Sequence, residues 1–486
     1  MRAVWIGRIA GPLLLALCLA VPSGLHGVEG AGSRPAAAAG VALWMAAWWL
    51  TEAVPIWVTA LLPLVLWPLL GVYGHGTVQD ARLATGAFLD GYLLLFLGGM
   101  ILGAGMEERG LHRRIALHVL RALGTAPRRL LLGMLVATAA ISMWISNTAT
   151  AVMMVPIALA LVRRLEEQPT GRLVHFGGAT LLGVAWASNL GGIGTKIGTG
   201  TNSIFAGFLA ERMNLDLGFL PYMVMATPFV ALSIPVAWFV LWRFGRRDAA
   251  GLRPVSVREE LAALGRMGRA ERTVAACFGA AALLWVCGDF LRPLVAPYVP
   301  SPWEGFKLQG KHWEASVAML AGLACWALGG VSLRAILRIP WSVLLLLGGS
   351  FALASGIEGS RLSVWMTAHL ETLAAAPLVV QMFGATAATV LLSAFASNTA
   401  TVNVMLNVLP QRFTVLAASA IGASCDFALP AGTPPNAIVF GSGYVSLPTM
   451  MRAGFAMDLA AIALVTIYAS TWIEAVASAL GLQGGV

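Results

Sequence analysis

Long apolar stretches, separated by short polar or arginine-rich segments, recur along the whole chain. At about 20 residues per crossing, the pattern predicts eleven membrane-crossing helices. They lie near residues 5–24, 36–51, 55–72, 91–107, 174–210, 221–243, 273–291, 313–331, 341–358, 413–443 and 449–478. The first could instead be a cleaved signal peptide, although its apolar run is long for one. The pattern therefore predicts an all-α polytopic membrane protein.

Two further apolar segments, 130–162 and 378–411, are too long for one crossing and short for two. Each carries the pentapeptide Ser-Asn-Thr-Ala-Thr near its midpoint, at 146–150 and at 397–401. We expect two re-entrant hairpins with the pentapeptides at their tips. One copy alone would favour helix capping or hydrogen bonds between helices. Two copies at matching positions favour a binding role, because polar groups are costly at membrane depth.

Composition agrees with a membrane protein. The chain is 58% hydrophobic and 11% charged, whereas soluble proteins average about 45 to 50% apolar and about 25% charged residues. The net charge of +9 does not indicate nucleic acid, because 17 of the 31 basic residues lie in the segments 109–129, 163–172 and 243–272. These segments are expected on the cytoplasmic side. We expect a bacterial inner-membrane protein with a cytoplasmic N-terminus.

The two hairpins are expected to enter the membrane from opposite sides. The first lies between arginine-rich cytoplasmic segments, and the second, between Glu371 and Arg412, enters from outside. Identical motifs with opposite entry indicate an inverted repeat. The repeat extends to Leu-Gly-Gly at 97–99 and 347–349, each in the helix before a hairpin.

A glycine- or proline-rich break follows each hairpin, at 191–202 and at 429–436. When the two are aligned at their terminal asparagines, Gly198-Thr199 falls on Gly432-Thr433. Glycine and proline unwind the helix, which frees carbonyl oxygens for a cation and leaves N–H groups that face an anion.

Serines add oxygen ligands near both tips. Ser142 shares a helix face with Ser146, and Ser393 shares one with Ser397. A small hard cation would find hydroxyl, amide and carbonyl oxygens together there.

The hairpin tips, the Thr-Pro-Pro-Asn sequence at 433–436 and the sequence Trp-Leu-Thr-Glu-Ala-Val-Pro at 49–55 resemble the divalent anion:sodium symporter family. The resemblance covers nearly the whole chain. Family members carry di- and tricarboxylates, and some carry sulfate. The resemblance implies a homodimer with an elevator mechanism, in which a transport domain moves against a scaffold domain. It also implies Na+ as the coupling ion, a small carboxylate as substrate and lipid as the surroundings.

The resemblance also implies site residues. One sodium site would use Ser142, Ser146, Asn147 and Gly198, and the other Ser393, Ser397, Asn398 and Gly432. The substrate would meet Asn147, Thr148, Thr199, Asn398, Thr399 and Thr433.

Two charged residues depart from the family pattern. Lys196 stands in the first break, and Asp426 precedes the second. We expect them to pair. Lys196 would then place a positive charge near the anion, in place of a sodium ion or for anion exchange, with Asp426 as counter-ion or proton carrier. The alternatives are a structural ion pair remote from the substrate and a lysine that reaches along the break to water.

The chain is thus expected to be a cation-coupled secondary transporter of succinate, malate, fumarate or citrate. Sodium-independent exchange and proton coupling are alternatives; a sulfate transporter, a channel and a membrane enzyme fit less well, since no catalytic motif occurs. The expected domains are N-terminal scaffold helices (1–90), a first repeat (91–243), a basic cytoplasmic loop (244–272), scaffold helices (273–340) and a second repeat (341–478).

Overall fold

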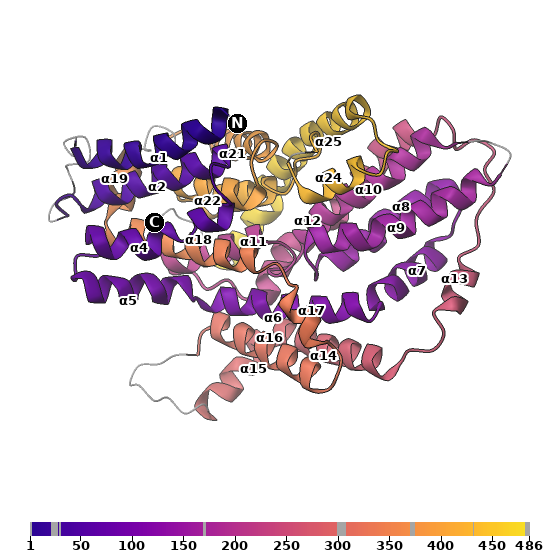
Figure 1. Cartoon of the computed structure of the whole chain (residues 1–486), viewed down its shortest axis with the longest axis horizontal. Coiled ribbons are helices and arrows are strands. Elements are labelled where there is room, and N and C mark those ends of the chain that lie inside the picture. Colours follow the sequence, from indigo (N-terminus) through magenta and orange to yellow (C-terminus); the bar gives the residue numbers. More distant parts are fainter. Residues whose placement is uncertain are drawn as a thin grey trace.

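The computed structural model describes residues 2–20, 28, 31–168, 172–298, 308–369, 375–430 and 432–481, and within these ranges the chain is helical without any strand (Figure 1). The expected all-α class is confirmed. The helices are α1 (Arg2–Ala20), α2 (Arg34–Thr51), α3 (Ile56–Thr59), α4 (Leu62–Leu70), α5 (Thr77–Phe88), α6 (Gly91–Glu108), α7 (Leu111–Leu123), α8 (Pro127–Ser142), α9 (Asn147–Glu166), α10 (Val174–Gly192), α11 (Gly200–Arg212), α12 (Phe219–Gly245), α13 (Arg258–Ala263), α14 (Arg269–Val286), α15 (Gly288–Val295), α16 (Gly310–Ala327), α17 (Leu333–Leu337), α18 (Trp341–Gly359), α19 (Leu362–His369), α21 (Leu378–Ser393), α22 (Asn398–Val408), α23 (Phe413–Gly422), α24 (Pro434–Phe440), α25 (Leu447–Tyr468) and α26 (Glu474–Ala479).

Among the described residues, five helical stretches are long and apolar enough to cross a membrane, or six if the pair α14–α15, bent by 81°, counts as one. The expected eleven crossings therefore remain a prediction. Several expected spans are divided in the structure: the stretch 55–72 becomes α3 and α4, and α4 has a proline, Pro63, within its first two positions. Proline lacks the N–H that would continue the preceding helix.

Each expected hairpin is a pair of helices joined by a short turn. α8 and α9 meet at the turn before Asn147, and α21 and α22 meet at the turn before Asn398. Ser146 caps α9 by accepting a hydrogen bond from Ala149 N at 3.4 Å, and Ser397 caps α22 by accepting one from Ala400 N at 3.2 Å. The pentapeptides thus stand at the tips, as expected. Re-entry into a membrane remains a prediction.

Each expected break interrupts a helix. α10 ends at Gly192 and α11 begins at Gly200, whereas α23 ends at Gly422 and α24 begins at Pro434. Both breaks are braced by the asparagine that follows them. Asn202 Nδ2 donates to the carbonyl oxygens of the first break, and Asn436 Nδ2 does the same in the second.

The repeated Leu-Gly-Gly sequences allow close helix packing. A methyl group on Gly98 of α6 would collide with the backbone of Ala318 on α16. A methyl group on Gly349 of α18 would collide with the carbonyl oxygen of Ala60, between α3 and α4. Small residues let two membrane helices approach backbone to backbone, so these glycines fix where α16 and the α3–α4 bend lie.

The N-terminal helices lie at one end of the molecule and α7 to α9 at the other (Figure 1). A separate hydrophobic cluster joins the N-terminal end, through Trp49 and Trp67, to Leu353 and Ile357 of α18. Trp67 Nε1 also donates to Ala352 O at 2.8 Å. The N-terminal helices therefore pack on the first helix of the expected second repeat.

Candidate functional site

The two hairpin tips and the two breaks line one cavity of about 270 Å³. Ten of the expected site residues line it: Ser146, Asn147, Thr148, Gly198, Thr199, Ser397, Asn398, Thr399, Gly432 and Thr433. Ser142 and Ser393 lie one layer behind, where each contacts the asparagine of its own tip. Segments that are far apart in the sequence thus form one site.

Helix N-termini face this cavity. α9, α11 and α22 begin with Ser146, Thr199 and Ser397 as their N-caps, and all three caps line the cavity. The free N–H groups and the positive end of the dipole at such a terminus favour an anion. α24 also begins there, but its first two residues are the prolines 434 and 435, which have no N–H to offer.

The cavity combines the polar tip residues with apolar side chains from α6 and α18, and its lining is uncharged. None of the described residues that line it is Asp, Glu, Lys, Arg or His. Charge for an anion must therefore come from helix termini or from bound cations.

Oxygen atoms gather behind the first tip. Ser142 Oγ lies 2.6 Å from Ser188 O and 3.1 Å from Asn147 Oδ1, which is hydrogen-bond distance to both. The carbonyl oxygen of Met143 accepts a hydrogen bond from the Thr195 hydroxyl and lies beside Gly198. Hydroxyl, amide and carbonyl oxygens of this kind are the ligands that hard cations use.

The second tip repeats this arrangement. Ser393 Oγ lies 2.7 Å from Ala423 O and 2.9 Å from Asn398 Oδ1. Gly432 packs so closely that a methyl group there would collide with Asp426 Oδ2. The hydroxyls of Ser146 and Ser397, by contrast, cap their helices, so the capping interpretation holds for those two side chains.

Three buried asparagines were missed as site residues. Asn189 joins the two halves, since its Nδ2 donates to Thr433 Oγ1 at 3.1 Å and its Oδ1 accepts from Asn147 Nδ2 at 3.4 Å. Asn202 and Asn436 brace the breaks. An amide inside an otherwise apolar stretch was the available signal, because buried polar groups require partners.

The expected pair between Lys196 and Asp426 is wrong. Lys196 Nζ lies 2.8 Å from both carboxylate oxygens of Glu314 on α16 and 5.2 Å from the centre of the Tyr92 ring. Lys196 does not line the cavity. The break turns its side chain away from the tips, towards α16, so its charge is already neutralised by Glu314.

Asp426 is also buried but has no such partner. Its carboxylate lies beside Gly432 and the side chain of Asn398, and no positively charged partner is found for it among the described residues.

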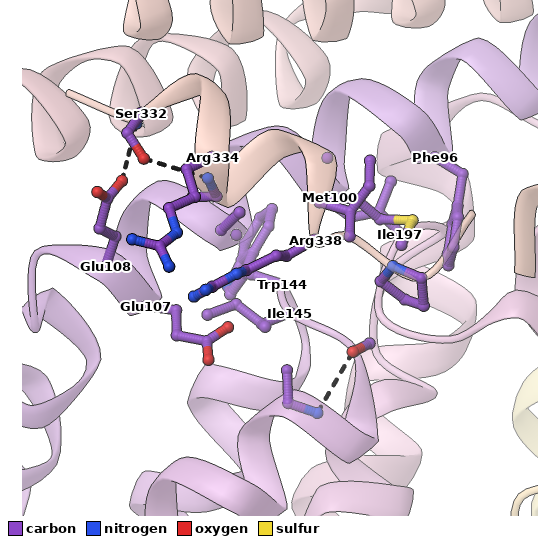
Figure 2. A pocket seen from close by; sticks show the side chains of 18 residues that line it. Phe96, Met100, Glu107, Glu108, Trp144, Ile145, Ile197, Ser332, Arg334 and Arg338 are labelled. Carbon is purple, nitrogen blue, oxygen red and sulfur yellow. Dashed lines mark hydrogen bonds between the residues drawn. The ribbon is translucent and has the colours of Figure 1, made fainter. Parts of the chain in front are cut away.

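A second cavity of about 290 Å³ adjoins the first and shares Phe96, Met100, Ser146 and Pro340 with it. Figure 2 shows Glu107, Arg334 and Arg338 around this space, together with the tip residues Trp144 and Ile145. We call it the vestibule. It has the charged lining that the central cavity lacks.

Comparison with known proteins places the chain in a family. The model of the citrate transporter family CitMHS matches residues 46–414. The sodium-dependent dicarboxylate transporter SdcS of Staphylococcus saprophyticus subsp. saprophyticus is 31% identical over 495 residues, which cover 95% of this chain and 90% of that protein. SdcS of Staphylococcus aureus strain USA300 is 31% identical over 484 residues, with 93% and 88% covered. The chain belongs to the divalent anion:sodium symporter family.

The transporter also shares its fold with a solved structure. The YdaH transporter of Alcanivorax borkumensis matches with a TM-score of 0.54 over 80% of this chain and 85% of that one, at 15% sequence identity. The transporter is an integral membrane protein, and the relatives that it matches are carriers rather than enzymes.

Proposed function

We propose that the transporter moves a di- or tricarboxylate of the succinate, malate, fumarate or citrate class across the bacterial inner membrane by sodium-coupled symport. The observation that carries this proposal is the central cavity, where both hairpin tips and three helix N-termini meet without a charged side chain. The tips would bind the carboxylates through Asn147, Thr148, Asn398 and Thr399, with Thr199 and Thr433 beside them.

Sodium would supply the missing positive charge. The first ion would lie among Ser142, Ser146, Asn147 and Gly198, and the second among Ser393, Ser397, Asn398 and Gly432. A dianion at membrane depth is costly unless it is compensated, so cations behind each tip would both neutralise it and order the tip. The relatives named as sodium-dependent dicarboxylate transporters support this choice of ion.

Alternating access completes the mechanism. The vestibule would lead from the cytoplasmic side to the central cavity, and the hairpins with their broken helices would move as a transport domain against the remaining helices of a homodimer. Sodium-independent exchange through Lys196 has little support, because Glu314 already neutralises that lysine.

Uptake by proteoliposomes tests the proposal. Labelled succinate should enter saturably when sodium is present outside, and unlabelled succinate inside should accelerate exchange. Citrate, malate, fumarate and sulfate as competitors would define the substrate class. Uptake that proceeds equally in choline chloride would refute sodium coupling, and flux without saturation would indicate a channel.

The tip amides provide a direct test of the site. Asn147→Ala and Asn398→Ala should each abolish saturable uptake, because each removes an amide oxygen that lies within hydrogen-bond distance of a serine hydroxyl. Both variants should remain monodisperse on size-exclusion chromatography. Wild-type kinetics in both would refute the site assignment.

A further inference from the structure

The carboxylate of Asp426 has no positively charged partner among the described residues, and its polar neighbour is the neutral side chain of Asn398. Asp426 is 1% exposed, and neither carboxylate oxygen meets full hydrogen-bond geometry with a described residue. A buried, unpaired carboxylate is strongly unfavourable. Either a bound cation or a proton on the carboxyl group would neutralise it.

Asp426 stands at the place where the proposed function puts the second cation. Its Oδ2 lies directly against Gly432, in a space that a methyl group would fill, and its carboxylate lies beside the side chain of Asn398. Asn398 and Gly432 are two of the four residues assigned to that cation.

The first repeat has no counterpart of this carboxylate. Asn202 donates to the carbonyl oxygens ten and seven residues before it, and Asn436 makes bonds with the same two spacings. By this pattern Gly192 corresponds to Asp426. Gly192 packs against Asn147 Oδ1, with no space for a side chain.

A third oxygen in the second break also lacks a donor. Asn436 Oδ1 is buried and unpartnered among the described residues, whereas Asn202 Oδ1 accepts a hydrogen bond from Thr201 Oγ1 at 3.3 Å. Asn436 itself is bonded to the backbone of Asp426. The second break thus holds three buried acceptor oxygens without a bonded donor among the described residues, two from one carboxylate and one from an amide, and the first break has no such carboxylate.

We propose that the carboxylate of Asp426 is a ligand of the second cation, and that this cation is a monovalent alkali ion. The inference rests on the proposed function for the position of that site. Of the two neighbouring buried acids, Asp426 and Asp458, Asp426 is the one that lies against Gly432 and Asn398. One carboxylate ligand balances a single positive charge, while divalent ions usually take several carboxylates. The neighbouring acid, Asp458, accepts a hydrogen bond from Phe427 N at 2.7 Å.

Fixed negative charge at the second site changes the order of binding. The charge of the second cation is balanced by the protein, so this ion binds before any substrate is present. The first site is neutral and would fill tightly only together with the anion.

Sodium binding without substrate tests the inference. We would measure the melting temperature of the purified transporter against sodium chloride concentration, with choline chloride keeping ionic strength constant and no carboxylate present. A ligand that binds only the folded state raises stability with concentration. The wild type should be stabilised by sodium, and Asp426→Asn should raise the apparent dissociation constant at least tenfold.

Two further variants complete this experiment. Asp426→Ala removes the carboxylate without adding bulk and serves if the asparagine variant does not fold. Asp458→Asn is the matched control, because it removes the charge of the neighbouring acid while an asparagine oxygen still accepts the bond from Phe427 N; it should shift the sodium titration much less than Asp426→Asn.

The outcomes separate this inference from the proposed function. An unchanged sodium titration in the folded Asp426 variants would overturn the inference, even if succinate uptake is sodium-coupled. Stabilisation of the wild type that requires added succinate would overturn it too. In a third outcome, the wild type binds sodium but does not transport succinate or the other carboxylates, and Asp426→Asn loses sodium binding. This result would uphold the inference and overturn the proposed function.

Discussion

Lys196 and Glu314 form an ion pair that is buried on both sides, with exposed fractions of 0% and 2%. Removing one partner would leave the other charge buried alone, which costs about 3–5 kcal/mol. Lys196→Met and Glu314→Gln should each lower the free energy of unfolding by about that amount. The double variant should recover most of the loss, because no unpaired charge remains. Denaturant unfolding in detergent measures all three.

An exposed ion pair is the control for these two single variants and the double variant. Arg164 and Glu259 are 3.5 Å apart, and the Glu259 side chain is 78% exposed. Glu259→Gln should change stability by less than about 1 kcal/mol. A double variant no more stable than the worse single variant would contradict the assignment of a simple buried pair.

Asn202 should be sensitive to loss of its donor. Its Nδ2 lies 2.7 Å from Gly192 O and 2.6 Å from Thr195 O. Asn202→Asp places an acceptor against these acceptors, so we expect loss of uptake and a loss of about 1–3 kcal/mol of stability. The exposed Asn214 offers a matched change, and Asn214→Asp should leave the melting temperature and uptake as in the wild type.

The partner of Lys196 could not be predicted from the sequence. The symmetry of the repeat suggested Asp426, because both residues lie in corresponding breaks. Glu314 is 118 residues further along, in a helix with no counterpart in the repeat argument. Residues that recur in both halves line one cavity, and their role in binding stays a prediction. Contacts between unrelated helices depend on packing that no local pattern encodes.

At the scale of the helices, Gly349 controls the approach of α18 to the bend between α3 and α4. Gly349→Ala would place a methyl group on the carbonyl oxygen of Ala60 and should lower stability by about 1–3 kcal/mol through overpacking. Gly384→Ala on α21 is the control, since its space is open, and it should gain about 0.5–1 kcal/mol from helix propensity. Equal melting temperatures for the two variants would contradict the close packing.

The helices also differ in how well the sequence predicts them. Hairpins and breaks were found because a repeated polar motif and clustered glycines and prolines mark them directly. α5 was missed because its sequence from Thr77 to Phe88 is only moderately apolar and carries Gln79, Asp80 and Arg82. Asp80 is nevertheless fully buried, where it accepts hydrogen bonds from the backbone N–H groups of Tyr73 and His75.

At the scale of the whole molecule, the vestibule predicts which side of the membrane reaches the site. It adjoins the central cavity and is lined by Ala335 of α17 together with Glu107, the penultimate residue of α6. The arginine-rich segment that follows α6 is expected in the cytoplasm. Ala335→Cys, in a variant whose five native cysteines are replaced, should therefore react with a membrane-impermeant thiol reagent from the cytoplasmic side only.

Tyr298→Cys is the control for the other side of the membrane. Tyr298 is 85% exposed between α15 and α16. The expected crossing at 273–291 places this segment on the side opposite the cytoplasmic segment 243–272, so Tyr298→Cys should react in intact cells. Under the proposed alternating access, the loaded site closes and turns the vestibule away from the cytoplasm. Sodium and succinate together should therefore slow labelling of Ala335→Cys and leave Tyr298→Cys unaffected. Reaction of Ala335→Cys in intact cells and not in inverted vesicles would reverse the orientation of the whole transporter. A labelling rate of Ala335→Cys that depends on neither sodium nor succinate would show that the vestibule is not part of the transport pathway.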